Sequence, residues 1–330
     1  MIKIIFILFI TMMINFLNIS KAEPSDDLHF NAWVAYWDEK SGIDEWQKIN
    51  NNYESISFFG AYFDKEEKLF IPDEFLDTIK NTEAKEKYLT IVNDVDKEDK
   101  ILFKDIEILK DILADKKKQK KHAEQIISLA KRANCNGIDL DYERVFKDEE
   151  VAELYLDFIK VLYKEANKNK LNLRIILEPS VNFKKYKFVR GPKYVVMAYN
   201  LYGTHSKEDG AKADINFIEN LIDKMQYLPQ NKGIAFATGG CYWTDKDKRK
   251  FISTKQIMQI LNKYDKIPQR DEKSGALFFD YEDNEQNKYK VWYADKETLS
   301  LWIDKAQELG IKDIFIWRLG SNEMEYNFNK

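Results

Sequence analysis

The segment that decides the fold is Asn136-Gly137-Ile138-Asp139-Leu140-Asp141-Tyr142-Glu143, in which acidic and apolar side chains alternate. Side chains on a β-strand alternate between its two faces, so the three carboxylates share one face and the apolar side chains share the other. The apolar face can pack against covering helices. The acidic face then points into the interior of a closed sheet, a position where branched apolar residues are usual.

Seven other apolar segments predict strands of the same sheet. Several are near-continuous apolar runs, which are typical of parallel strands lying under helices. The eight predicted strands are Asn31–Trp37, Ser55–Tyr62, Tyr88–Asn93, Gly137–Glu143, Leu173–Pro179, Tyr194–Asn200, Gly233–Gly239 and Asp313–Leu319.

Amphipathic helices are predicted between these strands, clearest at His122–Ala133, Val151–Ala166 and Leu299–Leu309. Eight strands that alternate with helices favour an α/β fold of the (β/α)₈ TIM-barrel class. An open doubly wound sheet is the alternative, but no glycine-rich phosphate loop follows the first predicted strand. Two β-type runs, Gly275–Tyr281 and Lys288–Tyr293, predict a small β-hairpin inserted before the last helix and strand.

The acidic face has a chemical interpretation. Three carboxylates in a low-dielectric interior repel one another, so at least one must hold a proton or be tightly hydrogen-bonded. Glu143 lies at the C-terminal end of its predicted strand, where barrel active sites form. A pKa raised by burial and by Asp141 suits a general acid at neutral pH. Two other interpretations stay open: a wet edge strand, or a calcium site built from carboxylates.

Length and composition limit the other function classes. The chain has 330 residues and a formal net charge of -4, so no overall basic field favours nucleic acid as a partner. The basic run Lys116–Lys121 is interpreted as a solvated helix face. The cysteines, Cys135 and Cys241, are expected roughly 15–20 Å apart at about 3.3 Å per strand residue. A disulfide needs Cα atoms within about 7 Å, so two free thiols are predicted.

The N-terminus predicts export. Lys3 precedes an apolar run from Ile4 to Leu17, and Ser20-Lys21-Ala22 has small residues where a signal peptidase cuts. We expect a signal peptide at 1–22 and one catalytic barrel at 23–330, secreted or periplasmic. An uncleaved anchor at the cell envelope is the alternative, although the run is short for a span of about 20 residues.

The acidic segment resembles the signature of glycoside hydrolase family 18, the chitinase and endo-N-acetylglucosaminidase family. The family's pattern is acid-Gly-apolar-Asp-apolar-Asp-aromatic-Glu, and Asn136 departs from it where the family usually has Asp. The segment Met197-Ala198-Tyr199-Asn200 is similar to the family's sixth-strand motif, with Asn200 in place of the commoner Asp. Ile316–Gly320 is similar to the end of the eighth strand, which carries the tryptophan beneath the reacting sugar.

This resemblance implies a retaining mechanism that uses the substrate as nucleophile. Glu143 would serve as general acid and base, and Asp141 would hold the 2-acetamido group of the sugar. Asp139 would support Asp141, Tyr199 would donate its hydroxyl to the acetamido group, and Trp317 would form the floor beneath the sugar. Met197 and Asn200 would complete the substrate site.

Other side chains have weaker assignments. Trp37 and Trp243 either stack on neighbouring sugars or pack in the core, whereas Trp46, Trp292 and Trp302 are interpreted as packing residues. His122 and His205 have no metal-ligand spacing and are predicted to lie on the surface. We therefore expect no metal or cofactor, a monomer, and a partner that is a glycan containing N-acetylglucosamine.

One further segment resembles a particular branch of the family. The segment before the last helix looks like the bacterial branch that includes spore-cortex peptidoglycan hydrolases; its sequence is Val291-Trp292-Tyr293-Ala294-Asp295.

Two alternatives to an enzyme remain. Lectin-like members of the family bind carbohydrate without cleaving it, and a structural wall protein with a relic site is the other alternative on the same fold. Such proteins usually lack the glutamate or the tyrosine, so the presence of Glu143 and Tyr199 favours an enzyme.

Overall fold

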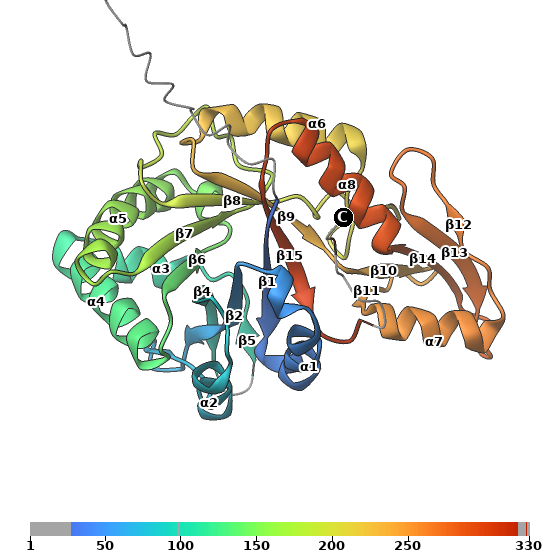
Figure 1. Cartoon of the computed structure of the whole chain (residues 1–330), viewed down its shortest axis with the longest axis horizontal. Coiled ribbons are helices and arrows are strands. Elements are labelled where there is room, and N and C mark those ends of the chain that lie inside the picture. The colour runs from blue at the N-terminus through green and yellow to red at the C-terminus, as the bar shows by residue number, and fades with distance from the viewer. Residues whose placement is uncertain (1–27, 98–99, 323–327, 329–330) are drawn as a thin grey trace, which may run out of the picture.

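Eight parallel strands form a closed barrel in chain order, and the last strand pairs with the first (Figure 1). The computed structural model describes residues 28–97, 100–322 and 328. This arrangement confirms the predicted (β/α)₈ barrel and all eight predicted strands. The barrel strands are β1 (His29–Ala35), β2 (Ser55–Phe63), β4 (Glu86–Asp96), β6 (Gly137–Asp141), β7 (Asn172–Leu177), β8 (Lys193–Met197), β9 (Lys232–Ala237) and β15 (Asp313–Leu319).

Helices surround the barrel, and four of them begin at an aspartate whose side chain accepts backbone N–H groups of the first turn. Turns across residues 178–192 join β7 to β8 in place of a helix. The α-helices are α1 (Glu39–Ile49), α2 (Asp73–Asn81), α3 (Glu107–Ile112), α4 (Lys116–Arg132), α5 (Glu149–Lys168), α6 (Ile215–Lys224), α7 (Thr254–Tyr264) and α8 (Lys296–Glu308). Short elements are η1 (Tyr36–Asp38), η2 (Asn50–Asn52), η3 (Val145–Lys147), η4 (Met225–Tyr227), β3 (Leu69–Phe70) and β5 (Ile101–Leu102).

The two faces of β6 lie in different environments, as the alternation of its sequence predicts. Ile138 and Leu140 belong to the large apolar layer between the strands and the helices. The barrel interior holds a separate apolar cluster that includes Trp33, Met197 and Phe315. Asp139 and Asp141 are therefore on the inward face of the strand, and both are buried.

The prediction that His122 lies on the surface is wrong. The residue is only 2% exposed, and its Nε2 lies 2.6 Å from the Tyr142 hydroxyl. The reason is the helix phase: α4 begins at Lys116, so the histidine lies on the same buried face as Ile126. Burial lowers its pKa to about 4, and it stays neutral at physiological pH. His205 is exposed, as predicted.

The predicted hairpin is present as β13 (Leu277–Glu282) and β14 (Lys288–Ala294), but it belongs to a larger insertion. A five-stranded antiparallel sheet in the order β11-β10-β14-β13-β12 packs with α7 beside the barrel (Figure 1). The remaining strands are β10 (Gly239–Thr244), β11 (Arg249–Ile252) and β12 (Gln269–Arg270). The insertion follows β9 directly, because Gly239 at φ +63 turns the chain out of the barrel.

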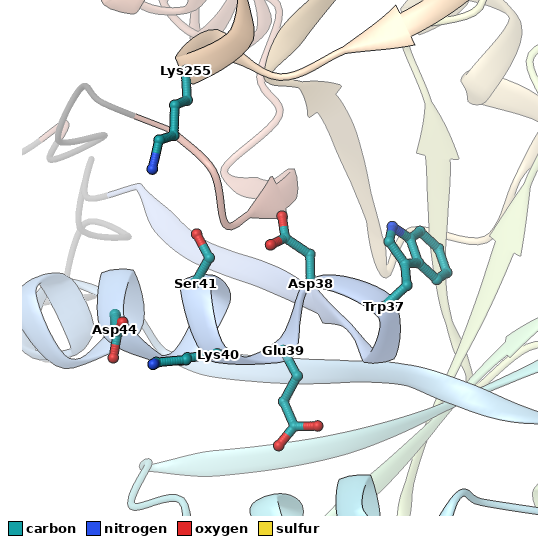
Figure 2. A pocket seen from close by; sticks show the side chains of 7 residues that line it. All are labelled: Trp37, Asp38, Glu39, Lys40, Ser41, Asp44 and Lys255. Carbon is teal, nitrogen blue, oxygen red and sulfur yellow. The ribbon is translucent and has the colours of Figure 1, made fainter.

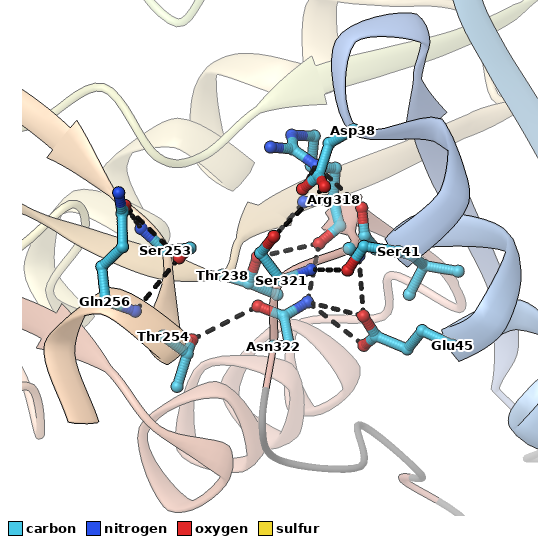
Figure 3. A network of polar contacts seen from close by, with 12 residues as sticks. Asp38, Ser41, Glu45, Thr238, Ser253, Thr254, Gln256, Arg318, Ser321 and Asn322 are labelled. Atoms are coloured by element: carbon cyan, nitrogen blue, oxygen red, sulfur yellow. Dashed lines mark hydrogen bonds and ion pairs between the residues drawn. The ribbon is translucent and has the colours of Figure 1, made fainter. Parts of the chain in front are cut away.

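A polar network joins α1 to the end of β15 and to α7 (Figure 3). Glu45 on α1 accepts the backbone N–H of Gly320 at 2.7 Å and the side-chain amide of Asn322 at 3.0 Å. The hydroxyl of Thr254, at the start of α7, donates to the other amide atom of Asn322 at 3.3 Å. Burial raises the pKa of Glu45 to about 7, against the hydrogen bonds that it accepts.

Replacing Glu45 by glutamine is expected to flatten the pH dependence of stability. The pKa of Glu45 rises from 4.5 to about 7 on folding, so its stabilising contribution is complete below pH 4.5 and is lost as the pH passes 7. The wild type should lose about 3 kcal/mol relative to Glu45→Gln across that range. Urea unfolding at several pH values measures this difference. Asp44→Asn, at an exposed position of the same helix, is the control, and parallel curves for wild type and Glu45→Gln would contradict the expectation.

Two further expectations concern cysteines and export. Cys135 and Cys241 are free thiols, as predicted, and both are buried. The predicted signal peptide, residues 1–22, lies outside the described residues. Within residues 28–97 and 100–322, no helix has the length and apolar character needed to cross a bilayer.

Candidate active site

The end of β6 differs from the prediction in one respect. The strand stops at Asp141, and Glu143 lies two residues beyond it rather than on its last position. The side chain of Asn93, near the end of β4, fixes the main chain of Glu143 on both sides. Its amide oxygen accepts the N–H of Glu143 at 3.0 Å, and its amide nitrogen donates to the carbonyl of Glu143 at 3.1 Å. Glu143 is thus rigidly placed at the C-terminal mouth of the barrel.

Asp139 lies deeper in the barrel, in register with Thr90 on β4 and Arg174 on β7. The Thr90 hydroxyl donates to Asp139 at 3.3 Å, and the Arg174 Nε lies 3.4 Å from its other oxygen. Burial raises the pKa of Asp139, and the guanidinium of Arg174 opposes that rise. At least one carboxyl in this column is predicted to be protonated or tightly hydrogen-bonded, and the polar partners of Asp139 nearest to its oxygens are Thr90 and Arg174.

Arg174 was missed by sequence reasoning, although it is the cation that accompanies the acidic column. Its guanidinium carbon lies 3.1 Å from the centroid of the Tyr88 ring, and one nitrogen donates to the Ser55 hydroxyl at 2.8 Å. The available indication was its place in the apolar run of β7, where it shares the inward face with Ile176. A lone charge at an inward position next to an acidic strand predicts an ion pair.

Asp141 and Glu143 share a strongly acidic environment. Burial is the main reason that the pKa of each carboxyl lies above its usual value. Asp94 on β4 and Glu178 just after β7 raise the pKa of both groups further, while Lys104 lowers it. Raised pKa values are what a group needs to carry a proton near neutral pH. In the part of the chain that the structure describes, no cluster of three or more potential ligands forms a metal site.

Tyr199 and Met197 come to the same mouth from β8. Met197 ends the strand and lies in the interior cluster, and the half-buried Tyr199 and Trp317 pack against that cluster. Burial and the negative charges of Asp141 and Glu143 raise the pKa of the Tyr199 hydroxyl well above 10, so it remains a proton donor.

Aromatic rings form one wall of the mouth. The ring centroids of Trp317 and Trp37 are 6.4 Å apart, and Phe59 lies 4.9 Å from Trp317. Trp37 is 53% exposed, so it offers a free ring face, and Trp317 is half-buried. Flat apolar rings open to solvent suit stacking on sugar rings, and the roles of these two tryptophans toward a sugar stay predictions.

Three other residues singled out in the sequence, Trp243, Asn200 and Asn136, lie in three different environments. Trp243 on β10 is only 6% exposed and its indole N–H donates to the carbonyl of Ser206 at 3.1 Å, which favours the packing alternative over sugar stacking. Asn200 follows Tyr199 in the loop after β8 and is half-buried. Asn136 is exposed at the start of β6, where it accepts the N–H of Lys87 at 2.8 Å. It is therefore at the opposite end of the strand from Glu143.

Two hollows flank the mouth. One of about 380 Å³ lies beside Trp37, and Lys255 extends over it toward Ser41 and Asp38 (Figure 2). The other, of about 320 Å³, is lined by Glu178, Phe146 and Tyr186. Glu143 lines neither hollow. One hollow lies at the end of β1, beside Asp38, and the other at the end of β7, beside Glu178; β6, which Glu143 follows, lies between these two strands in the barrel.

Comparisons with known proteins agree with this geometry. A sequence model described as "Glycosyl hydrolases family 18" matches residues 32–322. The "Uncharacterized glycosylase YvbX" of Bacillus subtilis is 26% identical over 229 residues, covering 65% of each protein, so the chain spans just under two thirds of that relative.

Among solved structures, the Bacillus cereus spore cortex-lytic enzyme SleL has a TM-score of 0.76 at 18% identity, over 91% of this chain and 72% of that one. A Cycas revoluta chitinase in complex with (GlcNAc)3 has a TM-score of 0.69 at 16% identity, over 88% and 94%. At these identities the two structures share the fold.

Proposed function

The chain belongs to glycosyl hydrolase family 18, and from that premise we propose that it is a secreted glycosidase acting on β-linked glycans that contain N-acetylglucosamine. One observation carries the proposal. Asp141 and Glu143 lie together at the C-terminal mouth of the barrel, with the Tyr199 hydroxyl beside them and the rings of Trp37 and Trp317 along one wall. Active sites of barrel enzymes form at this end.

The proposed reaction retains the configuration of the sugar and uses the substrate's own 2-acetamido group as nucleophile. Glu143 gives its proton to the glycosidic oxygen as that bond breaks. The acetamido carbonyl oxygen bonds to the anomeric carbon and forms a cyclic oxazolinium-type intermediate. Glu143, now a carboxylate, takes a proton from water as the water opens that ring.

The neighbouring groups support each step. Asp141 accepts the acetamido N–H and stabilises the positive charge that develops on the ring. Asp139 lies deeper on the same strand and pairs with Arg174 of β7, which supports the position of Asp141. Tyr199, kept protonated by its surroundings, donates its hydroxyl to the acetamido group. Trp317 forms the floor beneath the reacting sugar, and Trp37 stacks on a neighbouring one.

The proposal of export rests on the sequence of residues 1–22, whose apolar run and small residues match a signal peptide. N-terminal sequencing of protein recovered from the medium or periplasm of expressing cells tests it. A new N-terminus at Glu23 supports cleavage, and an intact Met1 in the membrane fraction supports the anchor.

A substrate panel tests the activity. The purified protein is incubated with N-acetylglucosamine oligomers, intact peptidoglycan and an N-glycan, and new reducing ends are measured over time. Peptidoglycan comes first, because a spore cortex-lytic enzyme shares the fold. Release from at least one polymer is expected. Binding to a glycan without release from any of them would contradict the enzyme assignment and support a lectin-like protein.

A further inference from the structure

Lys104 forms an ion pair with Glu143 across the barrel mouth, and no part of the proposed reaction uses it. We propose that Lys104 is a positioning residue for the proton donor. Its ammonium holds the Glu143 carboxylate in the empty site and leaves it when the glycosidic oxygen of a substrate arrives. This inference rests on the proposed function, because it assigns a role to Lys104 in the same reaction.

The backbone around Lys104 is built to place it. Lys104 adopts φ +57, a left-handed conformation that is uncommon for a residue with a side chain. Its N–H donates to the carboxylate of Asp94 at 2.8 Å, and the next N–H, of Asp105, donates to the carbonyl of Asn93 at 2.8 Å. The turn that carries Lys104 is therefore bound tightly to the end of β4.

Asn93 connects this turn to the proton donor. The same side-chain amide that holds the main chain of Glu143 also donates to the carbonyl of Asp105 at 3.1 Å. Asn93 is only 1% exposed. One buried side chain thus fixes the backbone of Glu143 and that of Asp105, the residue next to Lys104, and this distinguishes the Lys104–Glu143 pair from a mobile surface ion pair.

The charges around Glu143 explain why a cation is needed. Asp94 from β4, Asp141 from β6 and Glu178 after β7 all face it, and the neutral Tyr199 hydroxyl approaches from β8. The Glu143 side chain is 15% exposed and that of Lys104 is 36% exposed. Lys104 opposes the burial and the negative charges of Glu178 and Asp94, which raise the pKa of Glu143.

Displacement of Lys104 would couple binding to protonation. Contact with Lys104 keeps the pKa of Glu143 lower than burial and the neighbouring carboxylates alone would set it, which stabilises the carboxylate, the form that later accepts a proton from water. A glycan that separates the two groups removes the stabilising charge, so the acid form is favoured while the glycosidic oxygen is near. The ammonium can turn to solvent, to which a third of its side chain is already open.

The test measures the titration of Glu143 with and without Lys104. Carbon-13 NMR of glutamate-labelled protein follows each carboxyl, and Glu143→Gln identifies the resonance of Glu143. Lys104→Met should raise the midpoint of that titration, by about one pH unit or more for loss of an adjacent opposite charge. Lys104→Arg should restore the wild-type midpoint. Lys97→Met is the matched control, because Lys97, just after β4, pairs with Glu67 in place of Glu143.

The second measurement is the pH profile of kcat/KM, whose alkaline limb follows the acid form of the free enzyme's proton donor. In Lys104→Met that alkaline limb should shift to higher pH by the same number of pH units as the NMR midpoint. An unchanged midpoint, or a lower kcat/KM with the limb in place, overturns the role of Lys104. A shifted midpoint in a protein that cleaves no glycan in the panel overturns the proposed function instead.

Discussion

Replacing Glu143 by glutamine should lower kcat/KM on the cleaved glycan by a factor on the order of 10²–10⁴, which is the usual contribution of a general acid. Glutamine has nearly the same shape but no proton to give to the glycosidic oxygen. The main-chain hydrogen bonds from Asn93 do not involve the altered atoms, so the fold and the binding of the glycan should persist. Release of reducing ends and the affinity for an oligomer measure the two effects separately.

The control for this prediction is Glu124→Gln. Glu124 lies on the exposed face of α4, where it pairs with Lys120 of its own helix at 3.8 Å. Its replacement should leave kcat/KM unchanged. Equal activity of wild type and Glu143→Gln would remove Glu143 from the reaction, whatever the substrate is.

Replacing Arg174 by methionine should lower the free energy of unfolding by about 3–5 kcal/mol, the usual cost of breaking a buried ion pair from one side. Methionine fills much of the volume but leaves Asp139 as a buried carboxyl without its cation. The side chains of both residues are almost completely buried, at 4% and 0% exposure, so solvent cannot compensate. Urea unfolding at neutral pH measures the change.

The double variant Arg174→Met with Asp139→Asn isolates the cause. If the cost comes from the unpaired carboxyl, removing that carboxyl should recover most of the lost stability. The double-mutant cycle should then give a large interaction energy between the two positions. Arg132→Met, at the exposed end of α4, should change stability by no more than about 0.5 kcal/mol. Additive effects of the two inner substitutions would show that Asp139 and Arg174 do not stabilise each other.

Much of the fold and part of the site follow from local patterns. The period of two along β6 placed Asp139 and Asp141 inside the barrel, because side-chain direction on a strand depends only on parity. The same rule, applied to the ends of other strands, would have identified Asp94 and Glu178. His122 was predicted on the surface because it has no metal-ligand spacing, although it lies four residues before Ile126 and therefore on the buried face of α4.

The rest depends on contacts between distant residues. Lys104 reaches Glu143 across 39 residues from a loop without periodicity, and Asn93 is an ordinary strand residue until the loop folds back on it. The insertion was underestimated for a similar reason. β10 begins with two glycines and pairs with β14 across 45 or more residues, so nothing local marks it as part of the same sheet as the hairpin.

Pairing of β1 with β15 also has a consequence for the nascent chain. Seven barrel strands are translated before β15 exists, and until then β1 and β9 each carry an open edge that β15 will cover. The insertion and α8 lie between β9 and β15, which at roughly 5–20 residues per second delays closure by about 4–15 seconds. An open edge is a template for pairing with another chain, so during this interval the two unpaired strands expose the polypeptide to aggregation.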